Sequence, residues 1–219
     1  MKKYLSLGIA AALLAPALAM ADTGPTVSWT NWNSNTGGTV TQNSNTITVT
    51  YTGNNLGVSH DASIYDVPGS FTSAEVSSTP GSNGTVIMSG GTGGTVNTFH
   101  FSAPVVNPYI AVFSVGQGSV PVAFNFDQNF TLLSQGSGHW GGGTLVASGN
   151  SLVGHEGNGV IKFTGTYTDI TFTTPNYEYY YGATIGVASV AAVPEPGTYA
   201  MLLAGLGLVG AIARRRKQA

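Results

Sequence analysis

Glycine is spread through the interior of this chain, and its distribution limits what the chain can fold into. Of the 31 glycines, 26 lie between residues 22 and 193, so no stretch there is long and uninterrupted enough for an amphipathic helix. Short runs rich in β-branched and aromatic residues lie between them, and such runs are typical of strands. These 172 residues therefore favour one all-β domain with a single core.

The candidate strands alternate in polarity. Apolar side chains take every second position in Ile47–Tyr51, and the pairs Phe99/Phe101 and Ile170/Phe172 repeat that spacing. One face of each strand would pack, while Thr, Ser and Asn on the other face would meet water. We therefore expect a single antiparallel β-sandwich that is jelly-roll-like. The expected strands are residues 27–32, 46–52, 85–88, 95–102, 109–115, 120–126, 130–133, 144–147, 160–163, 167–173 and 183–190.

Clusters of glycine and asparagine mark the connections between these strands. We expect the runs at residues 90–94 and 141–143 to adopt the positive φ angles that tight or irregular turns require. Residues 53–84 are the least strand-like segment, because Ser, Pro and Gly interrupt them repeatedly. They are predicted to form long loops with short edge strands.

Charge is distributed unevenly along the chain. Lys162 is the only basic residue between 22 and 193, a region whose formal net charge is −7. Such a surface repels phosphate backbones, which argues against a nucleic-acid partner. The chain has no cysteine, and its histidines lack metal-ligand spacing, so we expect no metal site and no cofactor. Asp61, Asp66 and the run 127–129 offer oxygen ligands for calcium, but no calcium-loop pattern accompanies them.

Both ends of the chain have the features of transport signals. Residues 1–21 begin with two lysines, continue with an apolar run and end in Ala19-Met20-Ala21, which predicts a secretory signal peptide. Gly197–Ala213 carries no charge over 17 residues, and a helix of that length would span ~25 Å of the ~30 Å hydrocarbon core. The organisation expected is a signal peptide at 1–21, an ectodomain at 22–193 and a sorting segment with a transmembrane helix at 194–219. Basic residues should keep the end of that segment in the cytoplasm, namely Arg214, Arg215, Arg216 and Lys217.

The tail has three parts in a fixed order: Pro194-Glu195-Pro196, a Leu/Gly/Ala-rich segment and the basic cluster. Together they resemble the PEP-CTERM sorting signal of Gram-negative bacteria. The resemblance implies that an exosortase, a membrane-embedded transpeptidase, recognises Pro194, Glu195 and Pro196 and removes the tail. It also implies an inner-membrane intermediate, followed by release or attachment at the cell surface or in the extracellular matrix. Segments between residues 107 and 187 resemble the β-sandwich ectodomains common among PEP-CTERM substrates, which supports the fold and no particular activity.

Aromatic residues are the candidates for a binding site. Trp140, His139, Trp32 and Tyr180 could present flat apolar faces to sugar rings, as polysaccharide-binding sandwiches do. The alternative, in which Trp29 and Trp32 pack in the core or at a sheet edge and Tyr179 and Tyr181 point inward by alternation, stays open. The expected function is a structural or adhesive role without catalysis in exopolysaccharide or biofilm, with extracellular polysaccharide as a partner.

Two carboxyl groups support a different hypothesis. Glu156, which follows His155, and Asp127 would suit glycoside hydrolysis if their carboxyl groups flanked a sugar at the right separation. The chain would then be a carbohydrate-active enzyme that uses Glu156 and Asp127. In the competing interpretation, Glu156 accepts amide hydrogen bonds across its glycine-rich turn or pairs with Lys162. The leading hypothesis assigns no catalytic residue.

Overall fold

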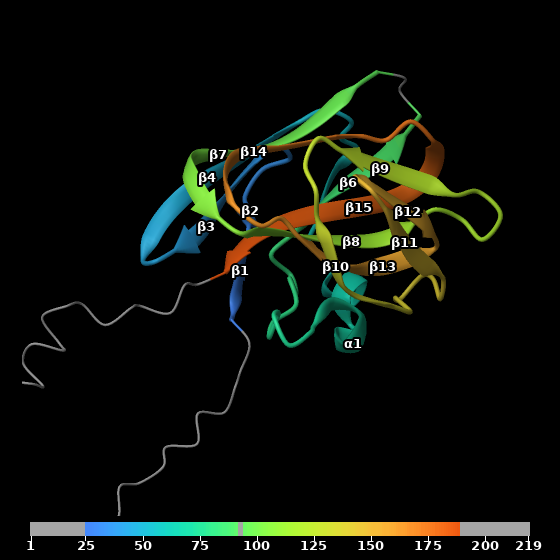
Figure 1. The fold of residues 1–219 in the computed structure, drawn as a ribbon, viewed down its shortest axis with the longest axis horizontal. Helices are drawn as coiled ribbons and strands as arrows, with labels where there is room; N and C mark the ends of the chain where they lie inside the picture. Colours follow the sequence, from blue (N-terminus) through green and yellow to red (C-terminus); the bar gives the residue numbers. More distant parts are fainter. Residues whose placement is uncertain (1–24, 92–93, 189–219) are drawn as a thin grey trace, which may run out of the picture.

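Strands in two sheets make up most of the computed structural model, which describes residues 25–91 and 94–188 (Figure 1). The predicted signal peptide at 1–21 lies outside the described residues. So does the sorting segment at 194–219, with Pro194, Glu195, Pro196 and the basic cluster. Within the described ranges, no helix has the length and apolar character needed to cross a membrane.

The first sheet has seven strands, in the order β10-β13-β8-β15-β6-β5, and β1 pairs with β15 beside this path. Every pairing in it is antiparallel. The strands are β1 (Val27–Trp29), β5 (Gly57–Ser59), β6 (Thr85–Gly90), β8 (Pro108–Val115), β10 (Thr131–Gly136), β13 (Gly157–Lys162) and β15 (Tyr177–Ala188).

The second sheet has eight strands, in the order β11-β12-β9-β14-β7-β4-β3-β2, and its pairings are also antiparallel. The strands are β2 (Asn31–Trp32), β3 (Gly37–Gln42), β4 (Asn45–Thr52), β7 (Val96–Val106), β9 (Val122–Phe126), β11 (Thr144–Ser148), β12 (Ser151–His155) and β14 (Thr166–Thr173).

Eight of these strands follow the order of a jelly roll. The quartet β6-β15-β8-β13 belongs to the first sheet and β7-β14-β9-β12 to the second, so the chain passes from one sheet to the other between β6 and β7 and again between β8 and β9. The late strands β14 and β15 each pair between two earlier strands of their own sheet, as two interleaved Greek keys require. The predicted antiparallel, jelly-roll-like β-sandwich is therefore confirmed.

The main core lies between the sheets, and the alternation seen in the sequence builds it. Ile47, Val49 and Tyr51 of β4 point inward, while the threonines between them are exposed. Aromatic rings dominate the interior: Tyr51 lies 4.9 Å from Phe99 between ring centroids, and further rings continue the contact across the sheet. Burying each such side chain contributes roughly 1.5–3 kcal/mol to folding, which makes this aromatic layer a main source of stability.

The outer face of the first sheet is covered as well. All eight residues of β8 are buried. We call residues 60–82 the covering segment; it contains η1 (Ala62–Tyr65) and α1 (Pro68–Phe71), whose apolar side chains pack on that face beside Phe113. The expectation of one packed and one wet face therefore holds for the second sheet and is wrong for the first. The loop-like segment supplies a second, smaller core.

The first and last described strands lie side by side. β1 pairs with the end of β15 in the register Val27 with Ala188, so both ends of the described chain leave the sandwich at the same place (Figure 1). β15 is 12 residues long and starts at Tyr177. Because a strand rises about 3.3 Å per residue, Tyr180 and Ala188 are separated by roughly 26 Å along it. The two ends of β15 therefore occupy opposite ends of the sandwich.

Candidate functional site

A hollow of about 520 Å³ opens where β15 begins, at the end of the sandwich remote from the chain ends. It combines three carboxyl groups with three aromatic rings, and no basic side chain lines it. We call it the Trp140 hollow. Its lining residues are Asp61, Ser114, Gln117, Trp140, Glu156, Glu178, Tyr179 and Tyr180.

The loop between β10 and β11 carries Trp140 and lies directly on the turn between β12 and β13. The backbone N–H of Gly143 donates to the carbonyl of Glu156 at 3.2 Å. A Cβ added at Gly143 would lie 1.4 Å from the His155 carbonyl oxygen, and one at Gly141 would lie 2.7 Å from a Glu156 carboxyl oxygen. None of the glycines at 141–143 has a positive φ, so that prediction is wrong. Gly141 and Gly143 are needed because the absence of a Cβ lets the loop approach the turn, which places Trp140 beside Glu156.

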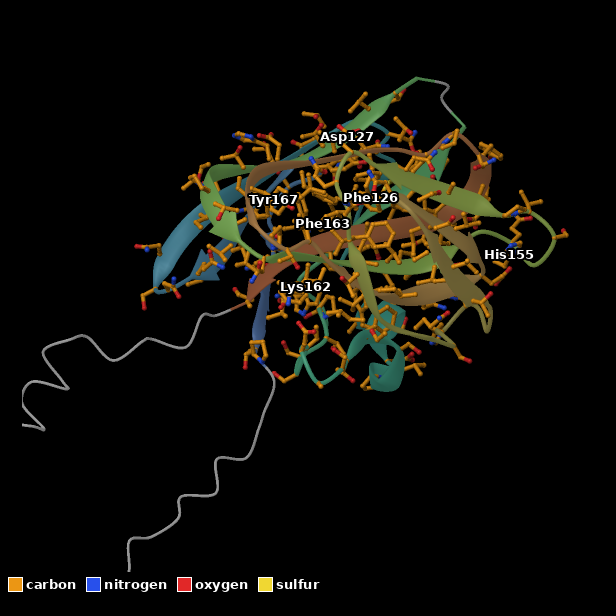
Figure 2. All side chains as sticks on the ribbon, viewed as in Figure 1. Phe126, Asp127, His155, Lys162, Phe163 and Tyr167 are labelled. Carbon is orange, nitrogen blue, oxygen red and sulfur yellow. The ribbon has the colours of Figure 1, made fainter. Side chains whose placement is uncertain are left out.

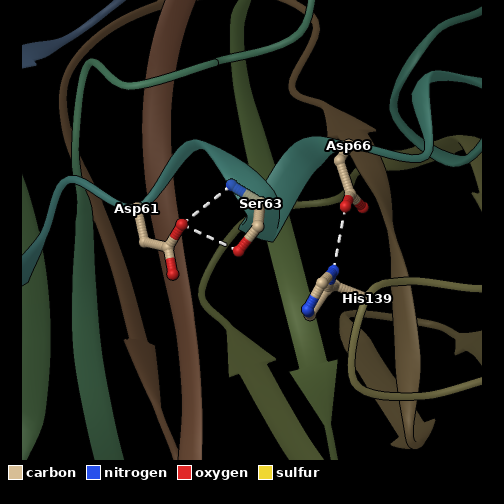
Figure 3. Close-up of polar contacts among 4 residues, drawn as sticks. All are labelled: Asp61, Ser63, Asp66 and His139. Atoms are coloured by element: carbon tan, nitrogen blue, oxygen red, sulfur yellow. Dashed lines mark hydrogen bonds and ion pairs between the residues drawn. The ribbon is translucent and has the colours of Figure 1, made fainter.

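The aromatic side chains form an open corner. Trp140 is 43% exposed, and its ring stands nearly perpendicular to that of Tyr180 at a centroid distance of 6.2 Å. Phe113 packs behind both rings, at 6.0 Å from Trp140 and 5.8 Å from Tyr180. His139 lies 4.6 Å from Trp140, and its Nδ1 is 2.9 Å from a carboxyl oxygen of Asp66 in the covering segment (Figure 3). This contact ties the Trp140 loop to the first sheet's cover.

An irregularity in β15 decides which side chains enter the hollow. The register of β15 against β6 shifts between Tyr177 and Tyr181. Simple alternation would place Tyr179 and Tyr181 on one face, but Tyr181 is buried and Tyr179 is 75% exposed. Glu178 instead lies inside, with 5% of its surface exposed. The shift therefore buries a carboxyl group at the base of the hollow and exposes tyrosines at its rim.

Gly116 connects the two glutamates of the hollow. Its backbone N–H donates to the Glu178 carboxylate at 2.9 Å, and its carbonyl accepts from the backbone N–H of Glu156 at 3.0 Å. Burial raises the pKa of Glu178 to about 7, against the opposing effect of hydrogen bonds from the backbone of Gly116 and Tyr180. The negative charge of Glu156 raises this pKa further. Glu178 therefore gains or loses its proton near neutral pH.

Asp61 supplies the third carboxyl group. It caps η1, and its Oδ1 accepts hydrogen bonds from the backbone N–H of Ser63 at 3.0 Å and from the Ser63 hydroxyl at 2.7 Å (Figure 3). These two bonds lower the pKa of Asp61, which keeps it ionised at neutral pH. The Trp140 hollow is therefore negatively charged.

Three of the four aromatic candidates meet at this hollow. Trp140 and Tyr180 line it, and His139 packs against Trp140. Trp32 does not belong to the group, because it is 1% exposed and its Nε1–H donates to the hydroxyl of Thr184 at 2.9 Å inside the core. The alternative of core packing is thus correct for Trp32, which presents no face to a ligand.

Glu156 and Asp127 are not brought together. Asp127 lines a separate hollow of about 490 Å³, where its carboxylate accepts from the Thr171 hydroxyl, and it lies far from His155, the neighbour of Glu156 (Figure 2). Lys162 pairs with Glu75 at 2.5 Å, so the expected pairing with Glu156 is wrong. The acidic neighbour of Glu156 is Glu178, which the sequence analysis missed. No group of three His, Cys, Asp or Glu side chains suited to a metal ion occurs in the described part of the chain.

Comparison with known proteins assigns the tail. The family model for the PEP-CTERM protein-sorting motif matches residues 192–217, which confirms the resemblance seen in the three-part tail. No curated protein and no solved structure matches the chain. The sorting route therefore follows from the motif, whereas the work of the sandwich has to be inferred from its own geometry.

Proposed function

We propose that the sandwich of this PEP-CTERM sorting domain-containing protein is a glycan-binding, adhesive component of the extracellular polysaccharide matrix without catalytic activity. The chain is exported and sorted to the cell surface by an exosortase. The Trp140 hollow is the site at which it holds the glycan. The observation that carries this proposal is the open corner formed by Trp140 and Tyr180 above hydrogen-bonding side chains.

The chemistry of the hollow supports a sugar ligand. Sugar rings have apolar faces that stack on aromatic rings, and their hydroxyl groups donate hydrogen bonds to carboxylates and amides. Trp140 and Tyr180 offer the first kind of contact, while Asp61, Gln117 and Glu156 offer the second. Exposed aromatic rings that adjoin one another in one hollow are typical of interaction sites.

The position of the hollow also supports the proposal. The sorting motif begins at residue 192, four residues after Ala188 at the end of β15. The hollow lies at the start of the same strand, roughly 26 Å away. While the tail is held at the membrane, the aromatic corner therefore lies at the end of the sandwich opposite to the one that joins the tail.

The proposal is tested by titrating the full-length chain, purified in detergent, with the exopolysaccharide of the producing cell and with a panel of glycans. Trp140→Ala and Tyr180→Ala should each weaken binding about tenfold, because an aromatic contact contributes roughly 0.5–1.5 kcal/mol beyond its buried area. Tyr177→Ala is the matched control, since Tyr177 is exposed but does not line the hollow. Absence of binding to every glycan, or equal binding by all variants, would contradict the proposal.

One observation favours a second function. Glu178 and Glu156 line the same hollow, and a carboxyl group with its pKa raised to about 7 is what a glycosidase general acid requires. This pair would replace Glu156 and Asp127 in a carbohydrate-active enzyme. The same titrations distinguish the two functions when released reducing sugar is measured. Release that is lost in a folded Glu156→Gln variant would establish the enzyme.

A further inference from the structure

We propose that the glycan held in the Trp140 hollow carries free amino groups, and that their ammonium charges lie among the carboxyl groups of Asp61, Glu156 and Glu178. This inference rests on the proposed function and deepens it by naming the class of ligand. The hollow would thus select a cationic polysaccharide, such as a polymer of hexosamine without its acetyl groups.

Charge is unbalanced in the Trp140 hollow. Three of the seven acidic residues that the structure describes line this one hollow, and no Lys or Arg accompanies them. Lys162, the only Lys or Arg in the described ranges, is paired with Glu75 and lines the other hollow. The imidazole of His139 contacts Asp66, and its charge also lowers the pKa of Asp61. Among the described residues, no Lys or Arg pairs with the carboxyl groups of the hollow.

Two of these carboxyl groups, those of Glu156 and Glu178, repel one another. The negative charge of Glu156 makes Glu178 harder to ionise, in addition to the effect of burial. A cation bound among them would relieve this repulsion, whereas a neutral sugar would leave it unchanged. A polymer of uronic acids would add to it. Charge alone therefore ranks amino-bearing glycans above neutral and acidic ones.

The aromatic rings of the hollow favour an amino sugar over other cations. The faces of Trp140 and Tyr180 attract cations and also stack on sugar rings. A lysine-rich peptide would offer the ammonium group without a ring to fill the corner, and an inorganic cation would use neither aromatic face. An amino sugar satisfies the carboxyl groups and the aromatic rings with one residue.

The surface around the Trp140 hollow is long enough for more than one sugar. A second hollow of about 400 Å³ shares Tyr179 and Tyr180 with the Trp140 hollow and extends to Leu56 and Val58 of the neighbouring loop and strand. Both hollows are open to solvent, because Tyr179 and Leu56 are exposed at their rims. This continuous surface is larger than one sugar requires and suits an internal stretch of a linear chain.

The test compares ligands of equal length against the full-length chain in detergent at about pH 6. The ligands are β-1,4-linked hexasaccharides of glucosamine, of N-acetylglucosamine and of glucose, with hexalysine as a cation that lacks sugar rings. We expect the glucosamine chain to bind about tenfold more tightly than the acetylated chain, with a preference that shrinks at high salt. Glu156→Gln should largely remove that preference, while Asp127→Asn, which removes a carboxylate from the other hollow, should preserve it.

Each other outcome has a defined meaning. Equal affinity for the free and acetylated hexasaccharides, with both lost in Trp140→Ala, would overturn the amino-group inference and leave glycan binding intact. Hexalysine binding as tight as that of the glucosamine chain, and unaffected by Trp140→Ala, would overturn it in favour of attraction by charge alone. If none of the three hexasaccharides binds and the natural exopolysaccharide does not bind either, the proposed function is contradicted as well.

Discussion

Glu178 lies in an unusual environment for a carboxyl group. Its carboxyl group is almost fully buried, and its pKa in the folded protein is about 7, against 4.5 for an ordinary glutamate. At a pH between these two values, Glu178 is therefore protonated in the folded protein and ionised in the unfolded chain. The contribution of Glu178 to stability consequently falls as the pH rises from about 4.5 to about 7. Above pH 7, folding bears the full free-energy cost of burying the ionised carboxylate.

Glu178→Gln is expected to stabilise the protein at pH 8 and to have much less effect at pH 5. The amide keeps an oxygen to accept from Gly116 but carries no charge to desolvate. We expect a gain of about 1 kcal/mol at pH 8, since a tenfold change in acidity corresponds to roughly 1.4 kcal/mol. Urea unfolding of both proteins at the two pH values measures this, and an equal difference at both would contradict it. Glu75→Gln, which breaks the ion pair with Lys162, should show no such gain.

At the scale of elements, strands with strict alternation were predictable, whereas two strands that contain glycine were missed. β4, with Ile47, Val49 and Tyr51, follows its sequence pattern closely. The sequence analysis missed β3 and β12, because β3 opens with two glycines and β12 contains Gly154. Pairing with neighbouring strands forms both despite their weak propensity. The turn before β4 uses Asn43 and Ser44 at positive φ, a substitute for the usual Asn-Gly signal.

The candidate site divides in the same way. Trp140, His139 and Tyr180 could be chosen as candidates by residue type, because aromatic residues close to glycines can be recognised in the sequence. Glu178 could not, because a register shift in β15, invisible in the sequence, turns it inward. The separation of Glu156 from Asp127 likewise follows from which strands pair, and no local pattern encodes that.

The contact between the Trp140 loop and the β12–β13 turn predicts that alanine substitutions at two adjacent glycines affect stability very differently. Gly143→Ala should cost about 3 kcal/mol of unfolding free energy and weaken glycan binding, because its Cβ would collide with the His155 carbonyl. Gly142→Ala should change stability by less than about 0.5 kcal/mol, since the nearest atom to its Cβ is the Ser137 hydroxyl oxygen at 3.7 Å. Chemical denaturation of both variants measures this, and similar stabilities would refute the packing argument.

Within the molecule, the region between the two predicted transport signals carries few charges, and almost all of them are negative. Residues 22–193 have a formal net charge of −7, so repulsion between molecules at neutral pH depends on ionised carboxylates. Acidification should remove that repulsion, beginning with Glu178 near pH 7 and continuing through the ordinary carboxylates near pH 4. We expect light scattering to rise as the pH falls from 7 to 4 and to reverse on neutralisation. Constant scattering across this range would count against the prediction.

β15 has a mechanical consequence for a protein held at a surface. Tyr179 and Tyr180 stand near its start and Ala188 at its end, so tension between a captured polymer and an attachment point beyond Ala188 would run lengthwise along this one strand. The ladder bonds to β8 and β1 lie across that direction. They would bear the load in shear and share it, rather than unzip one at a time. In this jelly roll, the strand that pairs with three neighbours therefore lies parallel to the force that would act between the cell surface and a bound polymer.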